Sequence, residues 1–424
     1  MTQSVGFRPS RRALTVPVDE ERTALYSTIT HSSAMLPCAP SGVQGALSRL
    51  SPGTLAELER YLLVEPEGGS DASSFQEYEA RRDVYRYRSG GLEFVVHLTF
   101  DCNLRCPYCY ENGIDRSRRL TDEGSVALMD YIEQTISAEL PKQVSVTFIG
   151  GEPSLSTDLL ELIARRTLEL HDNVRFFVVS NGTLLSDEFL DTCEQLGILR
   201  FQITVDGDRA LHDSLRSRPD GSGTFDQILS NIERMERRPG PFEIVVNCNL
   251  SDRNRDVAAS LISELERIQF HGDLIFSWVF GGAYTGFEST LGKHETTWLS
   301  THLVAEQHGY QHDPFYRVGY LACGMYSRAT RLLGADGFVY SCFSGIGRPD
   351  YQVGPMRRSD SPLFDCMWAA WLERPCFSPG CTTCEFVPVC NGNCTYLNDV
   401  SGYDCPRLSL RRNELELLRC HLRS

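Results

Sequence analysis

Six apolar, β-rich runs alternate with amphipathic helical patterns between about residues 93 and 310. The predicted strands are 93–100, 144–150, 174–182, 199–207, 242–250 and 274–281, and the helical patterns include 121–140, 158–171 and 224–237. This order predicts a parallel βα architecture. With right-handed crossovers, such a sheet curls into a partial barrel, whose strand carboxyl ends meet at one mouth. Six strands leave the barrel open at its side.

Three cysteines follow the first predicted strand within one short loop, Cys102-Asn-Leu-Arg-Cys106-Pro-Tyr-Cys109. Three thiolates at this spacing can hold three corners of a [4Fe–4S] cube and leave the fourth iron without a protein ligand. An iron left open in this way can bind a substrate. The alternative is a structural zinc knuckle, because close cysteines in an intracellular chain are often zinc ligands.

Short polar motifs close the next three predicted strands. They read Gly150-Gly151-Glu152-Pro153, Ser180-Asn181-Gly182 and Thr204-Val-Asp206-Gly207, and the last is followed by His212, Asp213 and Arg216. Taken singly, the first two motifs are turns, His212 and Asp213 are structural caps, and Arg216 is a solvated surface arginine. Their positions at successive strand ends favour a ligand site, and paired glycines allow close backbone approach.

The cysteine loop and these motifs, in this order, resemble the radical S-adenosylmethionine (SAM) superfamily. The resemblance implies a (β/α)6 partial TIM barrel with a [4Fe–4S] cluster on the catalytic cysteines Cys102, Cys106 and Cys109. SAM would chelate the open iron through its amino and carboxylate groups. The reduced cluster then splits SAM to a 5′-deoxyadenosyl radical that removes hydrogen from an unreactive C–H bond. The implied SAM-binding residues are Tyr108, Gly150, Gly151, Glu152, Pro153, Ser180, Asn181, Thr204, Asp206 and Arg216. Thr204 replaces the more usual serine but keeps the hydroxyl.

A second group of cysteines lies near the end of the chain. It comprises Cys323, Cys342, Cys381, Cys384, Cys390, Cys394 and Cys405, with Gly337 between the first two. The segment from Cys381 to Cys394 alone would also suit a zinc ribbon, but the whole pattern resembles the SPASM auxiliary-cluster domain. The resemblance implies one [4Fe–4S] cluster on Cys323, Cys342 and Cys394, and another on Cys381, Cys384, Cys390 and Cys405.

The first of these auxiliary clusters has no assigned fourth ligand. Cys366 or Cys376 could reach it, or its fourth iron is open to water or substrate. The remaining cysteines, Cys38, Cys193, Cys248 and Cys420, are interpreted as packed thiols.

Three domains are expected: an N-terminal element at 1–90, the barrel at 91–312 and the SPASM domain at 313–424. The first contains possible strands at 13–18 and 23–30, a helix-prone stretch to residue 63 and an acidic, Gly/Ser-bearing link near 65–74. This small α+β element resembles the winged-helix elements that capture a leader peptide as an added strand. A capping subdomain on the barrel fits equally well.

The composition of the chain limits the classes of partner that it can be expected to bind. The net charge of −15 argues against an extended nucleic-acid surface. The chain has no apolar run long enough to span a membrane, and residues 1–12 lack the apolar core of a secretion signal. A cytoplasmic protein with reduced, metal-binding thiols is therefore expected, without membrane or nucleic-acid partners.

Residues 93–405 resemble radical SAM/SPASM peptide maturases, which implies oxidative modification of a ribosomal precursor peptide, above all by crosslinking. The implied partners are that peptide and an external one-electron reductant of the flavodoxin or ferredoxin type. One alternative is an anaerobic sulfatase maturase, although Phe343 follows Cys342 where those relatives have an aspartate. Another is a non-catalytic iron–sulfur carrier or peptide scaffold. The sequence identifies no general base.

Overall fold

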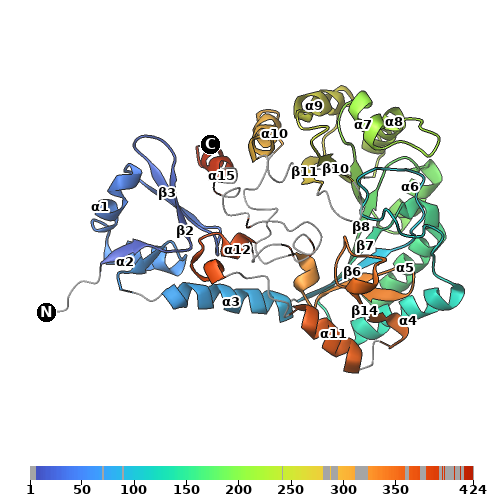
Figure 1. Ribbon diagram of the computed structural model, residues 1–424, viewed down its shortest axis with the longest axis horizontal. Coiled ribbons are helices and arrows are strands. Elements are labelled where there is room, and N and C mark those ends of the chain that lie inside the picture. The colour runs from blue at the N-terminus through green and yellow to red at the C-terminus, as the bar shows by residue number, and fades with distance from the viewer. Residues whose placement is uncertain are drawn as a thin grey trace.

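The computed structural model describes residues 6–68, 71–87, 90–240, 242–279, 287, 295–310, 323–358, 362–372, 379–390, 394, 396, 405, 411 and 415–423. A barrel-like βα body forms one side of the molecule, and a smaller N-terminal element lies on the other (Figure 1). Helix α3 (Asp71–Tyr87) runs between them.

The predicted six-stranded parallel sheet is confirmed. Its strands are β6 (Gly91–His97), β7 (Gln143–Ile149), β8 (Val174–Ser180), β9 (Arg200–Thr204), β10 (Glu243–Leu250) and β11 (Asp273–Trp278), each hydrogen-bonded to the next in chain order. The intervening helices are α4 (Asp122–Glu139), α5 (Thr157–Leu170), α6 (Asp187–Gln195), α7 (Arg209–Leu215), α8 (Phe225–Glu236) and α9 (Ala258–Arg267), and α10 (Glu295–Gln307) follows β11. This is the architecture that the (β/α)6 partial barrel requires.

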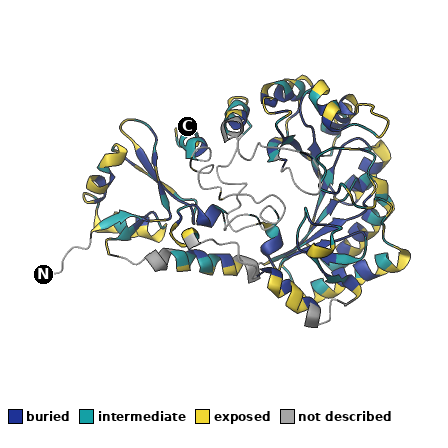
Figure 2. Ribbon diagram, viewed as in Figure 1, coloured by how far each residue is buried: buried dark blue, intermediate teal, exposed yellow. Residues whose placement is uncertain are grey.

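The two faces of the barrel sheet differ in polarity. Alternate residues, such as Phe94, Val146 and Val246, are fully buried in one core beneath the outer helices (Figure 2). The residues between them point to the inner face, and several of these are polar: Glu93, Ser145, Thr147, Gln202, Thr204, Asn247 and Asn249. A closed barrel fills its interior with apolar layers, whereas this inner face is suited to polar ligands.

Two of the barrel helices begin at residues whose side chains cap the first turn. The side chain of Thr121 accepts a hydrogen bond from the amide of Gly124 at the start of α4, and Ser186 accepts one from Phe189 at the start of α6. In both helices, two acidic residues follow the cap in the first turn. These acids face the positive end of the helix dipole.

The barrel sheet continues across the predicted boundary at 312/313. Strand β12 (Thr330–Leu333) pairs in parallel with β6, and β13 (Phe338–Tyr340) and β14 (Gln352–Pro355) extend the sheet as antiparallel strands. Helix α11 (Pro362–Leu372) packs near β14. The short 3-10 helix η5 (Gly324–Tyr326) precedes β12, η6 (Pro349–Tyr351) precedes β14, and η7 (Met356–Arg358) follows β14. The sheet order is therefore β11-β10-β9-β8-β7-β6-β12-β13-β14.

The N-terminal element contains the two predicted strands, β2 (Ala13–Pro17) and β3 (Thr23–Ser27). Together with β4 (Ser33–Leu36) they form an antiparallel sheet, and β1 (Phe7–Pro9) pairs with β5 (Val64–Pro66). The helix-prone stretch holds η1 (Pro40–Gly42), α1 (Val43–Leu47) and α2 (Pro52–Arg60). The prediction of a link over 65–74 is wrong at both ends, because its start belongs to β5 and its end to α3 (Asp71–Tyr87).

The end of the chain packs back onto this N-terminal element. Leu14, Val16 and Tyr26 share a buried core with Phe386 and Val389. The late segment contains η8 (Pro379–Thr383), α12 (Val387–Cys390) and α15 (Leu415–His421). The first and last parts of the chain thus share one hydrophobic core.

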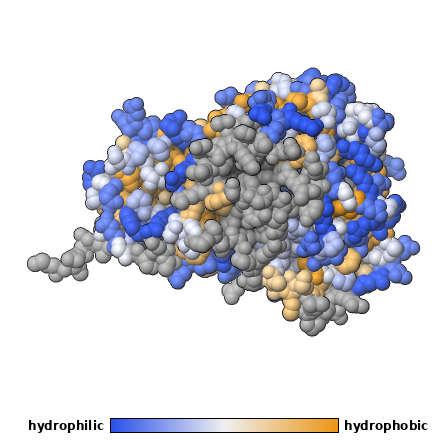
Figure 3. Space-filling view, viewed as in Figure 1, coloured by the Kyte–Doolittle hydropathy of each residue, from blue (hydrophilic) through white to orange (hydrophobic). Residues whose placement is uncertain are grey.

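Hydrophilic residues cover most of the described surface on the face seen in Figure 3, and apolar residues form scattered groups between them. Within the described ranges, no helix is both long and apolar enough to cross a membrane.

Changing Ser186→Ala removes the hydrogen bond that caps α6, so we expect the free energy of unfolding to fall by about 1 kcal/mol. Ser214→Ala is the matched control, because the hydroxyl of Ser214 is exposed and caps no helix. Urea unfolding followed by circular dichroism measures both. Equal stability of the two variants would contradict the role of Ser186 as a cap.

Candidate functional site

The cysteine loop, residues 102–109, lies against the turn that ends β7. The amide of Gly151 donates to the carbonyl of Thr99 at 2.8 Å, and that of Glu152 donates to the carbonyl of Asp101 at 2.9 Å. A β-carbon on Gly151 would lie 2.2 Å from the Asp101 carbonyl oxygen, and one on Gly150, whose φ is +158°, would lie 2.8 Å from that of Thr99. Only glycines allow this approach of two backbones.

The carboxylate of Glu152 joins the ends of β7 and β8. It is fully buried and accepts hydrogen bonds from the Ser180 hydroxyl at 2.8 Å, the Asn181 amide at 2.7 Å and the Ser154 hydroxyl at 2.7 Å. The side chain is thus occupied within the protein. A ligand at this turn would meet the backbone of Gly150 and Gly151, while Glu152 and Pro153 hold the turn in shape.

Asn181 carries this network into the cysteine loop. Its Nδ2 donates to Asn103 Oδ1 at 2.8 Å and lies 3.9 Å from the sulfur of Cys102. Asn103 in turn donates to the hydroxyl of Thr183 at 2.8 Å. The ends of two strands therefore fix the position of the first cysteine of the loop.

A second buried network closes the mouth at the ends of β9 and β10. The hydroxyl of Tyr108 donates to Asp206 and accepts from Arg216 at 2.7 Å. Arg216 Nη1 lies 3.7 Å from Asp206 Oδ2, and the other carboxylate oxygen accepts from the amide of Asn249 at 2.8 Å. Arg216 is 8% exposed, so its interpretation as a solvated surface residue is wrong. Thr204 lies beside this network and is 7% exposed.

His212 and Asp213 are structural. The buried His212 Nδ1 accepts from the amide of Asp206 at 3.2 Å, and its Nε2 lies 3.0 Å from the Thr224 hydroxyl. Asp213 accepts from the amides of Thr224 and Phe225 at the start of α8. Burial, with Arg216 as a lesser cause, lowers the pKa of His212 to about 3. The imidazole is therefore neutral at physiological pH.

The three thiols of the loop all have raised pKa values. Burial raises the pKa of Cys102 to about 11 and that of Cys109 to about 12, and it also raises the pKa of Cys106. A bound metal would reverse this effect, because coordination deprotonates a thiol. Two further polar atoms at the mouth, Arg216 Nε and Asn247 Oδ1, are buried without a hydrogen-bond partner among the described residues. These thiols, the glycine turn and the two unsatisfied polar atoms fit an iron–sulfur cluster and a zwitterionic ligand such as SAM.

Three cysteines of the second group come together. Burial raises the pKa of Cys342 above its ordinary range, and the neighbouring thiols of Cys323 and Cys394 raise it further. Burial likewise raises the pKa of Cys323 to about 11, with Cys394 and Glu93 among the contributors. The predicted set of Cys323, Cys342 and Cys394 is thus a spatial cluster. Arg348 attaches this region to the cysteine loop, since it donates to the carbonyls of Tyr110 and Asn112 at 3.0 and 3.1 Å.

The other predicted set lies at the N-terminal element. Cys381, Cys384 and Cys390 pack against the core of Leu14, Val16 and Phe386. Cys405 is exposed, as is Cys366 on α11, and Cys376 lies outside the described residues. Among the described residues, no three His, Cys, Asp or Glu side chains have the mutual spacing of ligands to a single metal ion. Thiolates of a cubane bind separate irons, so their spacing is wider.

Sequence reasoning missed two polar residues of the inner face. Glu93 on β6 accepts from the hydroxyls of Thr330 and Thr147 at 3.3 and 3.5 Å, and burial raises its pKa. Asn247 on β10 contributes one of the unsatisfied atoms. A polar residue at every second position of an otherwise apolar strand was the available signal.

Sequence reasoning also missed the pair that anchors the far end of the cysteine loop. His97 Nε2 lies 3.1 Å from Glu111 Oε1, and both residues are buried. No spacing rule would have paired them, because the contact depends on how the loop folds back on β6.

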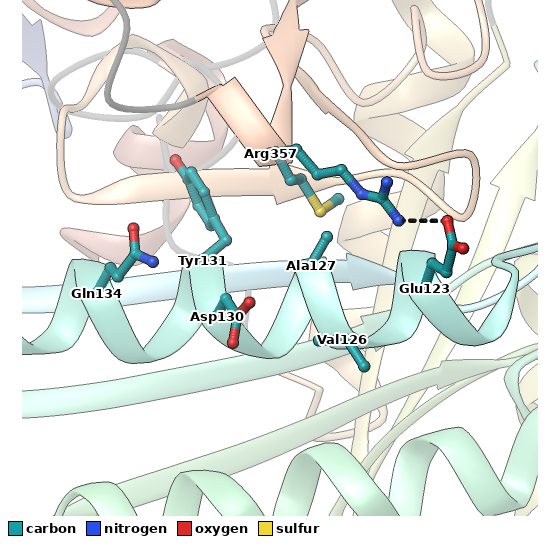
Figure 4. Close-up of a pocket in the computed structure, with 8 residues that line it drawn as sticks. Glu123, Val126, Ala127, Asp130, Tyr131, Gln134 and Arg357 are labelled. Carbon is teal, nitrogen blue, oxygen red and sulfur yellow. Dashed lines mark hydrogen bonds and ion pairs between the residues drawn. The ribbon is translucent and has the colours of Figure 1, made fainter.

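One cavity of about 470 Å³ lies on the outer side of α4 (Figure 4). Its lining residues are Glu123, Val126, Ala127, Asp130, Tyr131, Gln134, Met356 and Arg357. Arg357 and Glu123 form an ion pair at 3.0 Å across its rim. It contains none of the cysteines and none of the predicted SAM contacts.

Comparison with known families gives one domain match. Residues 96–262 match the Radical SAM superfamily, a span that includes the cysteine loop, the glycine turn, Asn181, Asp206 and Arg216.

Three relatives are similar over part of their length. The chain is 30% identical over 181 residues to an AdoMet-dependent heme synthase of Methanosarcina barkeri, covering 41% of this chain and 48% of the relative. It is 27% identical to a cysteine-type anaerobic sulfatase-maturating enzyme of Clostridium novyi, covering 36% and 42%. It is 28% identical to the sporulation killing factor maturation protein SkfB of Bacillus subtilis, covering 40% and 38%. The chain thus spans less than half the length of each relative.

Solved structures share the fold over much more of the chain. Native anSMEcpe with bound AdoMet and Kp18Cys peptide aligns with a TM-score of 0.62 at 16% identity, covering 78% of this chain and 98% of that one. SuiB of Streptococcus suis bound to the precursor peptide SuiA aligns with a TM-score of 0.55 at 12% identity, covering 92% and 95%. At these identities, the likeness concerns the fold.

We expect Gly151→Ala to prevent assembly of the cluster on Cys102, Cys106 and Cys109, because the added methyl group overlaps the Asp101 carbonyl. Iron per chain after anaerobic reconstitution should fall by about four, and SAM cleavage should be lost. Gly45→Ala is the control, since its added β-carbon has no atom within 4 Å. Full iron content and normal SAM cleavage in Gly151→Ala would contradict this account of the turn.

Acid should destabilise the fold through His212. Its folded pKa of about 3 lies below its ordinary value, so the unfolded chain takes up a proton below about pH 6.5 that the folded chain does not. Between pH 7.5 and 5.5, the unfolding free energy should fall by about 1.4 kcal/mol more in the wild type than in His212→Gln. Urea unfolding under anaerobic conditions at both pH values measures this, and equal pH dependence in the two proteins would contradict it.

Proposed function

Because residues 96–262 match the Radical SAM superfamily, we propose that this chain is a radical SAM maturase that oxidatively modifies a ribosomally made precursor peptide, by forming a crosslink. The proposal is supported by the presence of three parts in one chain. They are the cysteine loop at the barrel mouth, the group of Cys323, Cys342 and Cys394, and an N-terminal sheet packed on Cys381, Cys384 and Cys390. A fold of this extent is shared with Streptococcus suis SuiB in its complex with the precursor peptide SuiA.

Cys102, Cys106 and Cys109 would hold the SAM cluster, and two further [4Fe–4S] clusters would occupy the sets containing Cys323 and Cys381. Bound together, a reduced cluster and SAM supply a radical that can remove hydrogen from an unreactive C–H bond. The role of the protein is to position the ligand at the cluster. Gly150 and Gly151 would receive the ligand closely, Arg216 would pair with its carboxylate, and Tyr108 is held in place by Asp206 and Arg216.

The peptide would enter through the open side of the barrel, and its leader would bind the N-terminal element. Strand β4 is at the edge of the described three-stranded sheet. An extended peptide can add to such an edge through main-chain hydrogen bonds. Electrons would come from a flavodoxin- or ferredoxin-type donor.

An anaerobic sulfatase maturase is the second candidate. It is favoured by the C. novyi relative and by the position of Glu93. Phe343 occupies the place of the usual aspartate, but Glu93 is a half-buried carboxylate near Cys323, so it could accept the substrate proton instead. The heme synthase among the relatives demonstrates that similarity at this level does not select a substrate.

The test is anaerobic co-expression with a short peptide encoded beside the gene, followed by intact mass and fragmentation. We expect the wild type to give a product lighter by two hydrogens, with two residues that no longer fragment separately. The variant with Cys102, Cys106 and Cys109 changed to alanine should leave the peptide unmodified. Cys38→Ala is the matched control, because Cys38 packs in a separate apolar core.

An unchanged mass requires analysis of the peptide for epimerisation. If mass and stereochemistry are both unchanged while SAM is cleaved, the peptide proposal fails. A sulfatase-derived substrate is then tested, with Glu93→Gln expected to abolish formylglycine formation.

A further inference from the structure

Arg12 is a fully buried cation in the N-terminal element. It precedes β2, and its side chain has no exposed surface. Arginine is almost never fully buried unless it is paired. The guanidinium donates to the carbonyls of Thr382 and Cys384, within the Cys381-Thr-Thr-Cys384 turn more than 300 residues away in sequence. Its Nε has no hydrogen-bond partner in the described part of the chain.

These contacts are with neutral carbonyl groups and pair the charge of Arg12 with no carboxylate of the described residues. Among the described residues, no carboxylate lies within ion-pair distance of its guanidinium, although the ring of Phe75 lies 5.5 Å from it. Carbonyl oxygens satisfy the donors but do not neutralise the cation, and a buried, unpaired charge is destabilising. The thiol of Cys384 is a close neighbour. It becomes anionic when it binds a metal.

We propose that Arg12 is a positioning residue for the iron–sulfur cluster on Cys381, Cys384, Cys390 and Cys405, which it orients through the turn and whose negative charge it balances. This inference rests on the proposed assignment of that cluster. A cation beside the cluster stabilises its more negative, reduced form. Arg12 therefore raises the reduction potential of this cluster above the value that the four cysteines alone would give.

Docking of the late segment does not depend on Arg12 alone. The hydroxyl of Thr28 donates to the carbonyl of Glu385 at 2.8 Å, a neutral contact with the same turn. Leu14, Val16 and Tyr26 pack against Phe386 and Val389. Removing the Thr28 hydroxyl therefore weakens docking without changing the charge, whereas removing Arg12 changes both.

The experiment is an anaerobic redox titration of the reconstituted full-length protein, followed by electron paramagnetic resonance. Cys384→Ala identifies the signal of the cluster in question. Arg12→Met should lower the reduction potential of that cluster by at least about 59 mV, a tenfold change in its one-electron equilibrium constant, and leave the others unchanged. Arg12→Lys keeps the charge and should stay near the wild-type potential. Thr28→Val and Arg11→Gln, an exposed neighbouring charge, should have wild-type potentials.

The outcomes distinguish the effect of the Arg12 charge from weaker docking of the late segment and from a wrong assignment of the cluster. A wild-type potential in Arg12→Met overturns the inference, and so does an equal shift in Thr28→Val. If Arg12→Met holds no cluster, Arg12→Lys decides: a wild-type potential supports the role of the charge, and a lowered potential overturns it. If Cys384→Ala loses neither iron nor a signal, the cluster assignment itself fails and the inference fails with it.

Discussion

The cysteine loop has to be held rigidly at the carboxyl ends of parallel strands, and the buried carboxylate of Glu152 is the interaction on which this depends. Glu152 accepts hydrogen bonds from Ser180 and from the Asn181 amide, so the ends of β7 and β8 cannot move apart without removing hydrogen-bond donors from a buried carboxylate. Its own amide meets the carbonyl of Asp101 beside the first cysteine. The spacing of β7 and β8 therefore determines where the first cysteine of the loop lies.

Asp206 has the corresponding role on the other side of the mouth. It connects β9 to Asn249 on β10 and holds Tyr108 and Arg216 in one buried group. Burial raises the pKa of Asp206, while Arg216 opposes that effect. Glu152 and Asp206 therefore have the same structural role. Each is an acid at a strand end that organises the groups that would face the ligand, with its own oxygens engaged by the protein.

The strands and the mouth could be predicted because their signals are local. Alternating apolar residues gave the six strands, and the carboxyl ends of parallel strands must meet, so Gly151, Asn181 and Asp206 were expected together. The pairing of β12 with β6 had no such signal, because four residues, Thr330–Leu333, say nothing about which strand they join. The contacts of Arg12 and Glu93 could not be predicted from the sequence for the same reason. Their partners, Cys384 and Thr330, are distant in sequence and are brought near only by packing.

These long-range contacts explain why the chain divides poorly into separate domains. Strand β12 continues the barrel sheet, and Arg348 reaches the carbonyls that follow Cys109. Arg12, near the start of the chain, meets the turn at Cys384, and Arg423, near its end, donates to the carbonyl of Val18 at 2.7 Å. The cysteine loop and the turn at Cys384 are therefore each held by hydrogen bonds from residues that are distant in the sequence. Arg12 and Thr28 therefore connect the N-terminal element directly to the segment 382–385, which includes Cys384.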